Sequence, residues 1–415
     1  MTRQIRLDSA ASRLCLLWAG LGLYVAPYAM PDIVSFSLLG RVLDHLPQLG
    51  LPLILYSLLT SLHPSQCDRT RAGWALTGCM IAWHVWMALR TDPEDMLALV
   101  TYFDPFGYTL YLFPLLLLIP VTPLLCSCLT VGRWLMVLGI PLMLMTLVWY
   151  ASFSAIQFTF EGYVAFAGLM LMTCRYHSRN WVWMSALALL TALLVVTVKA
   201  RRNLMMTTAL YLMGGLYMLL FYKQKMTRER RIFIVLCAIS VLLVGAGLFV
   251  IGSKGMFAEI SSRANENTRA YVFLLFFWDM LQTPLDCLIG RGIRGMYECP
   301  GIDDGGSELR SAVENGILNM MLKGGIIYVV LYLTTLVTAI RKAWHCQNQI
   351  CRAATFIIGV QLFDQIAFGL HSVSIKAFII WMCVSLCLCP GICEKTDDEM
   401  RDMLYEKRPK LPKWK

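Results

Sequence analysis

The sequence predicts an all-α integral membrane protein that crosses the bilayer with about twelve helices. Two features of the composition indicate this class: hydrophobic residues make up 58% of the chain, and charged residues only 15%. Soluble domains carry about 25% charged and about 45–50% apolar residues. The mean hydropathy is +0.62, and apolar runs of spanning length recur throughout. We therefore expect one transmembrane domain over residues 1–415.

Apolar runs long enough to cross a bilayer predict the spans in order. Their ranges are 12–30, 46–62, 72–89, 108–129, 133–152, 155–174, 180–198, 203–222, 231–252, 314–339, 353–370 and 374–391. Pro120 and Pro123 predict a kink in the fourth span, which neighbouring helices can tolerate. A basic loop at Arg133 is expected to separate the fourth span from the fifth. The sequence shows no internal repeat of the kind many transporters have.

Lysine and arginine set the predicted orientation, because they are retained on the cytoplasmic side. With Arg3 and Arg6 inside, alternate loops place many basic residues on that same side: Arg69, Arg71, Arg133, Arg175, Arg179, Arg341, Lys342 and Arg352. The basic tail 392–415 is also cytoplasmic, so both termini are inside. The net charge of +10 then faces anionic lipid, and no nucleic-acid partner is needed to explain it.

Two basic segments fall on the outer side, against this rule. One is the turn from Lys199 to Arg202, and the other is a large loop over 253–313. Arginine presents a rigid fork of donors that matches phosphate oxygens. The segments therefore predict a site for a lipid-linked phosphate or diphosphate, formed by Arg201, Arg202, Arg263, Arg269, Arg291 and Arg294. Alternatively, these side chains extend to lipid head groups or pair with nearby carboxylates.

The end of the outer loop contains two further candidates. In the stretch GRGIRG, from Gly290 to Gly295, glycines allow successive N–H groups to face an anion. Ser311 and Glu314 have the spacing of a capping box that opens the tenth span. Glu314 is alternatively a general base, although a helix start and nearby arginines weaken a carboxylate in that role.

Ionisable residues inside apolar runs are functional candidates by default. Glu161 begins the sixth span and is interpreted as interfacial. Asp364 lies in the eleventh span, and His371 and Lys376 flank the turn that follows it. The alternative for each is an ordinary interhelical hydrogen bond. Most of the fifteen cysteines lie in apolar runs, where a thiol acts as a small hydrophobe. No metal-binding spacing is evident, so no metal is predicted.

Segments in a fixed order carry a family resemblance. They are VVTVKARRNLMMTTALY from Val195, SSRANENTRAYVF from Ser261, PLDCLIGRGIRG from Pro284 and ENGILNMMLKGGIIYVVLYL from Glu314. Over roughly residues 190–340 the chain resembles the O-antigen polymerase and O-antigen ligase (Wzy and WaaL) superfamily of bacterial inner membranes. The rest of the chain matches only as hydrophobic spans.

The resemblance implies a C-type glycosyltransferase bundle with a large periplasmic loop. Such proteins act in the inner membrane on undecaprenyl-diphosphate-linked glycans, as donor and as acceptor, without a nucleotide sugar, metal or other cofactor. Membrane lipid and a chain-length regulator protein are further expected partners. By position, Arg201 or Arg202 holds the diphosphate together with loop arginines such as Arg263, Arg269, Arg291 and Arg294.

The expected activity is polymerisation of lipid-linked repeat units for O-antigen, capsule or exopolysaccharide. Arg291 and Glu314 are the expected catalytic residues, and His371 and Asn315 are secondary candidates. Ligases carry a histidine where this chain has Glu314, which favours a polymerase, but a ligase acting on lipid A core or protein stays open. A precursor transporter or flippase, and a scaffold without chemistry, are the alternatives from other classes.

Overall fold

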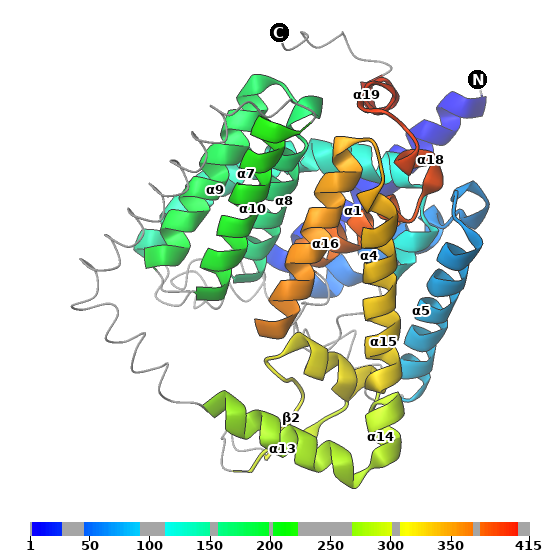
Figure 1. Ribbon diagram of the computed structural model, residues 1–415, viewed down its shortest axis with the longest axis vertical. Coiled ribbons are helices and arrows are strands. Elements are labelled where there is room, and N and C mark those ends of the chain that lie inside the picture. The colour runs from blue at the N-terminus through cyan, green and yellow to red at the C-terminus, as the bar shows by residue number, and fades with distance from the viewer. Residues whose placement is uncertain are drawn as a thin grey trace.

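The computed structural model describes residues 2–26, 45–91, 113–149, 157–198, 202–222, 268–300, 308–367 and 374–405. Within these ranges the chain is almost entirely helical (Figure 1). The larger helices are α1 (Thr2–Val25), α4 (Leu46–Ser61), α5 (Arg71–Leu89), α7 (Val121–Trp149), α8 (Gln157–Met172), α9 (Arg179–Val198), α10 (Arg202–Phe221), α13 (Thr268–Gln282), α15 (Gly316–Trp344), α16 (Gln349–Ala367) and α17 (Ile375–Cys387). Short elements connect them: η2 (Pro64–Gln66), η3 (Phe113–Leu118), η4 (Cys174–Tyr176), α14 (Pro284–Ile289), β1 (Tyr297–Glu298), β2 (Leu309–Arg310), α18 (Pro390–Cys393) and α19 (Asp397–Tyr405).

Helix length and composition support a multi-pass membrane protein. Five described helices are long and apolar enough to cross a bilayer: Arg71–Leu89, Val121–Thr146, Arg179–Thr197, Asn203–Leu220 and Gly316–Trp344. Shorter apolar helices cover Arg13–Val25, Leu46–Ser61, Phe160–Met172, Tyr271–Gln282 and Ile375–Cys387. The all-α membrane class is therefore confirmed, while these helices do not establish twelve spans. The expected span 231–252 lies outside the described residues.

Helix α7 corrects one predicted boundary. Arg133 is predicted to lie in a loop between two spans, but α7 runs continuously from Val121 to Trp149 through this residue. The charge does not end the helix because its guanidinium donates to the Tyr405 hydroxyl at 3.0 Å. Pro120 directly precedes α7 and Pro123 lies in its first turn, where proline is tolerated. The two prolines therefore begin a helix and do not kink one.

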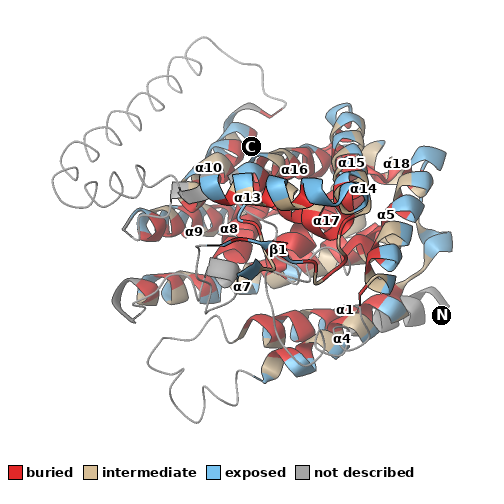
Figure 2. Cartoon of the chain, turned by 90° about the horizontal axis from the view of Figure 1, so that it is seen from below, coloured by how far each residue is buried: buried red, intermediate tan, exposed pale blue. Residues whose placement is uncertain are grey.

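Helices α8 and α17 form the centre of the bundle (Figure 2). All 13 residues of α17 are buried, and so are the residues of α8 from Phe160 to Met172. A helix that is apolar on every side is buried on every side. Helices α7, α10, α15 and α16 pack around this pair, which places any polar group of α8 or α17 inside the protein.

The turns between helices gather at two ends of the bundle (Figure 1). We call one the α19 end: it holds α18, α19 and the turns 62–70, 173–178 and 345–348, joined by bonds such as Asn348 Nδ2 to Ile392 O at 2.8 Å. The other is the α13 end, where α10, α15 and α17 begin and α16 finishes. The predicted inner basic loops that fall on described turns share the α19 end.

Asp397 of α19 fastens the C-terminal helix to the turn 173–178 and to the start of α16 at the α19 end. Its Oδ1 atom accepts from the Tyr176 hydroxyl and from the Gln349 amide, each at 2.7 Å. Its Oδ2 atom lies 3.5 Å from Arg175. Burial, reinforced by this carboxylate, raises the pKa of Tyr176 well above its ordinary value. The phenol therefore stays a hydrogen-bond donor at all physiological pH values.

His177 makes the stability of the α19 end sensitive to acid. Burial, together with the Arg133 guanidinium, lowers its pKa to about 3. Arg133 NH2 lies 3.3 Å from Nδ1, and the Thr173 hydroxyl lies 2.9 Å from Nε2. Since a guanidinium only donates, Nδ1 accepts and the ring is neutral.

We therefore expect stability to fall as the pH drops below about 6.5, because only the unfolded state then binds the proton. Between pH 7 and pH 5 the expected loss is about 2 kcal/mol. It is measured as the free energy of unfolding in detergent. His177→Asn should be less stable at pH 7 but should lose most of this acid dependence. An equal acid dependence in the variant would contradict the assignment.

The predicted large loop contains folded structure at the α13 end. Helix α13 is followed by α14 and by a short antiparallel pair in which Tyr297 lies opposite Arg310. Val272, Phe276 and Met280 of α13 form a separate small core with Leu322 of α15. The opposite face of α13 leaves large apolar side chains exposed: Tyr271, Leu274, Phe277, Trp278 and Leu281. The segment thus packs on α15 and presents an apolar surface outward.

Candidate functional site

Three charged side chains meet inside the bundle near the α13 end. Lys376 of α17 contacts both Glu161 of α8, at 3.0 Å, and Asp364 of α16. The side chains are only 3%, 2% and 1% exposed, respectively. Moving charges out of water costs several kcal/mol per ion unless partners compensate. With all three ionised, this ion cluster has a net negative charge, which favours an additional proton or a nearby cation.

The ends of three helices position the cluster. Ser374 caps α17 by accepting from the Ala377 amide, which fixes Lys376 in the first turn. Glu161 lies near the start of α8, and Asp364 lies one turn before the end of α16. Helices α8 and α17 approach closely at Gly162 because this residue has no side chain. A Cβ placed there would lie only 2.6 Å from the Ile375 side chain. The cluster therefore lies near the ends of these helices and away from their middle.

Helix α10 joins the cluster through its first turns. Asn203 Nδ2 donates to Asp364 Oδ1 at 2.7 Å, and the Thr207 hydroxyl lies 3.3 Å from the same oxygen. In the part of the chain that the structure describes, several buried polar groups nearby have no hydrogen-bond partner: the Asn203 amide oxygen, the Tyr211 hydroxyl and the Gln361 amide. Unpaired buried polar groups are costly, so these atoms are suited to bind water or a polar ligand.

The start of α15 reaches the same end of α16. Asn315 caps α15 by accepting from the amides of Ile317 and Leu318, and its Nδ2 atom donates to Ile366 O at 2.8 Å. This corrects the predicted capping box, because the cap is Asn315 and not Ser311. Glu314 is exposed and lies just outside the helix. It is therefore placed at the surface beside the end of α16, in a position where a substrate can reach it.

Arg291, a predicted catalytic residue, is extensively paired with protein groups. Its guanidinium contacts Asp279 and lies 3.2 Å from Asp286. It also donates to Met296 O at 2.8 Å and to the Thr283 hydroxyl at 3.0 Å. These bonds join α13, α14 and the segment that follows them. Arg291 is therefore placed to stabilise the packing of α13, α14 and the segment that follows them.

The GRGIRG segment docks on α15 and does not present its N–H groups as an anion site. The amides of Arg291 and Gly292 donate to Leu322 O at 2.8 Å and Lys323 O at 3.0 Å. The Ile293 amide donates to the Thr91 hydroxyl at 3.3 Å. The prediction that these amides face a diphosphate is therefore wrong. The glycines are needed here because a Cβ at Gly290, where φ is +75°, would overlap Lys323 O.

The other predicted site residues have varied positions. Arg202 and Arg269 lie in the first turns of α10 and α13, where the structure describes the backbone only, and Arg294 is half-buried. Arg201, Arg263 and His371 lie outside the described residues. Both views separate α10 from α14 (Figures 1 and 2). The described residues therefore bring Asn203, Asp364 and Asn315 to one place, while Arg291 lies farther along α15.

The sequence indicated Asp364 and Lys376 as candidates, but the second carboxylate that pairs with Lys376 was missed. Glu161 was interpreted as interfacial because it lies near the start of an apolar run, yet its side chain is only 2% exposed. The available signal was charge balance: one lysine and two carboxylates stand in apolar stretches, all three near span ends that are predicted to face the outer side. Opposite charges inside a bilayer are expected to pair.

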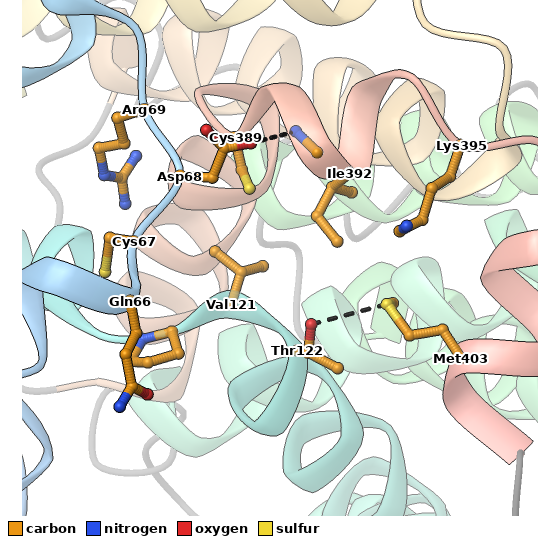
Figure 3. Close-up of a pocket in the computed structure, with 12 residues that line it drawn as sticks. Gln66, Cys67, Asp68, Arg69, Val121, Thr122, Cys389, Ile392, Lys395 and Met403 are labelled. Carbon is orange, nitrogen blue, oxygen red and sulfur yellow. Dashed lines mark hydrogen bonds between the residues drawn. The ribbon is translucent and has the colours of Figure 1, made fainter.

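A pocket of about 190 Å³ lies at the opposite end of the protein (Figure 3). It is bordered by the turn before α5, by the start of α7 and by α18. Two of its charged residues, Asp68 and Arg69, bond to other parts of the fold. Asp68 accepts from the Gly391 amide at 2.7 Å, and Arg69 donates to Leu117 O at 2.8 Å and to the Ser385 hydroxyl at 2.7 Å. We therefore assign no chemistry to this pocket.

Comparison with known proteins gives no independent assignment. No protein-family model matches the chain, and searches of curated proteins and of solved structures found no similar protein.

Proposed function

We propose that this protein is a membrane glycosyltransferase that joins lipid-diphosphate-linked oligosaccharide units at the α13 end of the bundle. One observation carries the proposal. Asn203, which directly follows the basic turn from Lys199 to Arg202, is hydrogen-bonded to the buried ion cluster at Asp364. A diphosphate carried by a lipid lies at the head-group level, so helix ends suit it better than the bilayer centre.

In the proposed reaction, a sugar hydroxyl of the acceptor attacks the anomeric carbon of the donor glycan. The bond from that carbon to the diphosphate oxygen breaks, and undecaprenyl diphosphate leaves with the electron pair. Arg201 and Arg202 stabilise the charge that grows on the diphosphate. Glu314 accepts the proton of the attacking hydroxyl, since it is exposed beside the end of α16. The ion cluster holds α8, α10, α16 and α17 in register.

The surface of α13 suits a lipid-bound substrate. Leu274, Trp278 and Leu281 are 69%, 71% and 66% exposed on one side of the helix. Tryptophan is enriched where protein meets the membrane–water interface. We place α13 in that interface, beside the site that a lipid carrier approaches.

Replacing Arg202 tests the proposed chemistry. We expect Arg202→Ala to reduce polymer formation by about 10²–10³, the usual effect of removing one donor to a developing anion. Arg341→Ala, which removes an exposed arginine at the α19 end, should polymerise normally. The readout is the length distribution of surface glycan in a deletion strain expressing each variant at equal level.

The same strains separate the polymerase from the ligase. Loss of a polymerase leaves single repeat units on the acceptor, whereas loss of a ligase leaves polymer on the lipid carrier. Long glycan on the normal acceptor in the Arg202→Ala strain would contradict the proposed site. Arg291→Ala is a poor probe of chemistry, because it also breaks the contacts to Asp279 and Asp286.

A transporter for a polysaccharide precursor is the second candidate, favoured by the buried ion cluster itself. Buried lysine and carboxylate groups form proton relays in many transporters. Purified protein in liposomes distinguishes the two. New glycosidic bonds on lipid-linked units support the transferase, whereas proton-dependent movement of these units across the bilayer without new bonds supports the transporter.

A further inference from the structure

Three cysteine side chains from separate segments meet at the α19 end. The sulfur atoms of Cys346, Cys351 and Cys393 all lie within 4.8 Å of one another. Cys346 follows the end of α15, Cys351 lies in the first turn of α16, and Cys393 ends α18. Cys346 and Cys351 are buried, and Cys393 is half-buried. The fold thus brings Cys393 to two cysteines of the α15–α16 turn, the nearer of which, Cys351, is 42 residues away in the sequence.

The spacing of the sulfur atoms matches a shared metal ion. The Sγ atoms of Cys351 and Cys393 are 3.9 Å apart. Two thiolates that bind one zinc tetrahedrally at about 2.3 Å have sulfur atoms roughly 3.8 Å apart. A disulfide requires sulfur atoms about 2.05 Å apart, and all three cysteines are free.

A buried asparagine holds the ligands in place. Asn348 Nδ2 donates to Ile392 O at 2.8 Å and to Lys395 O at 3.1 Å, on both sides of Cys393. Its Oδ1 atom accepts from the Cys351 amide at 2.8 Å. One side chain therefore fixes the segment of Cys393 against that of Cys351. Groups that orient ligands in this way are typical of metal sites.

The cluster also has an open side. A pocket of about 310 Å³ is lined by Lys342, His345, Cys346, Gln347, Cys393 and Glu394. An imidazole, a carboxylate or a water can complete tetrahedral zinc coordination there. Three thiolates around a divalent ion leave one negative charge. Lys342 in the pocket and Arg352, whose Nε donates to Cys346 O at 3.4 Å, are placed to offset it.

We propose that Cys346, Cys351 and Cys393 bind a zinc ion whose fourth coordination position faces the pocket beside His345. Thiolates select soft ions such as zinc. The three thiols lose their protons on binding. The ion joins the α15–α16 turn to α18 and so fastens residues 390–405 to the bundle. It lies at the opposite end from the proposed transferase site, so either proposal can fail without the other.

Metal content tests the proposal directly. Full-length protein is purified in detergent with a reductant, loaded with zinc chloride and dialysed into metal-free buffer. We expect about one zinc per chain in the wild type and below about a tenth of that in Cys351→Ser. The matched control is Cys67→Ser, a half-buried cysteine at the same end, which should retain zinc. Wild-type protein without zinc, or zinc retained in Cys351→Ser, would overturn the proposal.

A second measurement needs no variant and therefore does not depend on correct folding of one. Alkylation of the wild type with N-ethylmaleimide is followed for each cysteine by mass spectrometry. Zinc should protect Cys346 and Cys393 from modification, and a chelator should remove that protection while Cys67 reacts equally in both states. Equal reactivity with and without chelator, or a Cys351–Cys393 disulfide in the purified protein, would overturn the assignment.

Discussion

Lys376→Met is expected to destabilise the protein by about 3–5 kcal/mol, the usual cost of leaving a buried charge without its partner. Lys376 lies between Glu161 and Asp364, and all three side chains are at most 3% exposed. Water therefore cannot solvate the negative charges of the two carboxylates that lose their lysine partner. The effect is measured as the free energy of unfolding of the purified protein in mild detergent.

Companion variants separate lost charge pairing from lost packing. Adding Glu161→Gln and Asp364→Asn to Lys376→Met should recover much of the stability, because a neutral buried cluster carries little desolvation cost. Lys395→Met, at the α19 end and partly exposed, should change stability by less than about 0.5 kcal/mol. A loss below about 1 kcal/mol for Lys376→Met would show that water reaches the cluster.

Gly325→Ala is expected to cost more than about 3 kcal/mol, through two additive causes. Gly325 interrupts α15 with φ 71° and ψ −177°, a backbone conformation that residues with a side chain rarely adopt. In addition, a Cβ there would overlap the carbonyl oxygen of Leu288 in α14. The substitution should therefore push α14 away from α15. Unfolding free energy and protease sensitivity of residues 268–300 report the effect.

Gly359→Ala is the matched control for Gly325→Ala. Gly359 lies inside α16 and nothing is within 4 Å of a Cβ placed there. Alanine in a helix interior should stabilise it by up to about 1 kcal/mol. If both variants destabilise the protein equally, the damage does not come from the break in α15.

The sequence predicted the helical membrane class well, since long apolar runs have few other solutions. It failed where a local signal was outweighed by a tertiary contact. Arg133 indicated a loop, but one guanidinium nitrogen of this residue, NH2, bonds to Tyr405 and His177 while Arg133 stays inside α7. The Ser311 capping box was plausible by spacing, but Asn315 caps α15 instead, and its Nδ2 atom donates to the distant Ile366 O. Such contacts depend on residues far away in the chain.

Residue types and their location in the chain were predictable for the candidate site, but the pairing was not. The polar character of Asp364 and Lys376 was evident in apolar runs, whereas the contact of Lys376 with Glu161 depends on the packing of α8 against α17. Likewise, the charge of Arg291 made it a candidate catalytic residue, and only the fold shows that it forms ion pairs with Asp279 and Asp286. Cys346, Cys351 and Cys393 lacked any motif spacing.

The break in α15 has a consequence for hydrophobic matching with the bilayer. A straight helix of the 29 residues from Gly316 to Trp344 would be roughly 43 Å long, well beyond a hydrocarbon layer of about 30 Å. After Gly325, about 19 residues remain, or roughly 28 Å. The second half alone therefore fits the thickness of the membrane. With α13 in the membrane interface, as we propose, the first half of α15 lies at that boundary, and the lipid need not thicken nor the helix tilt steeply.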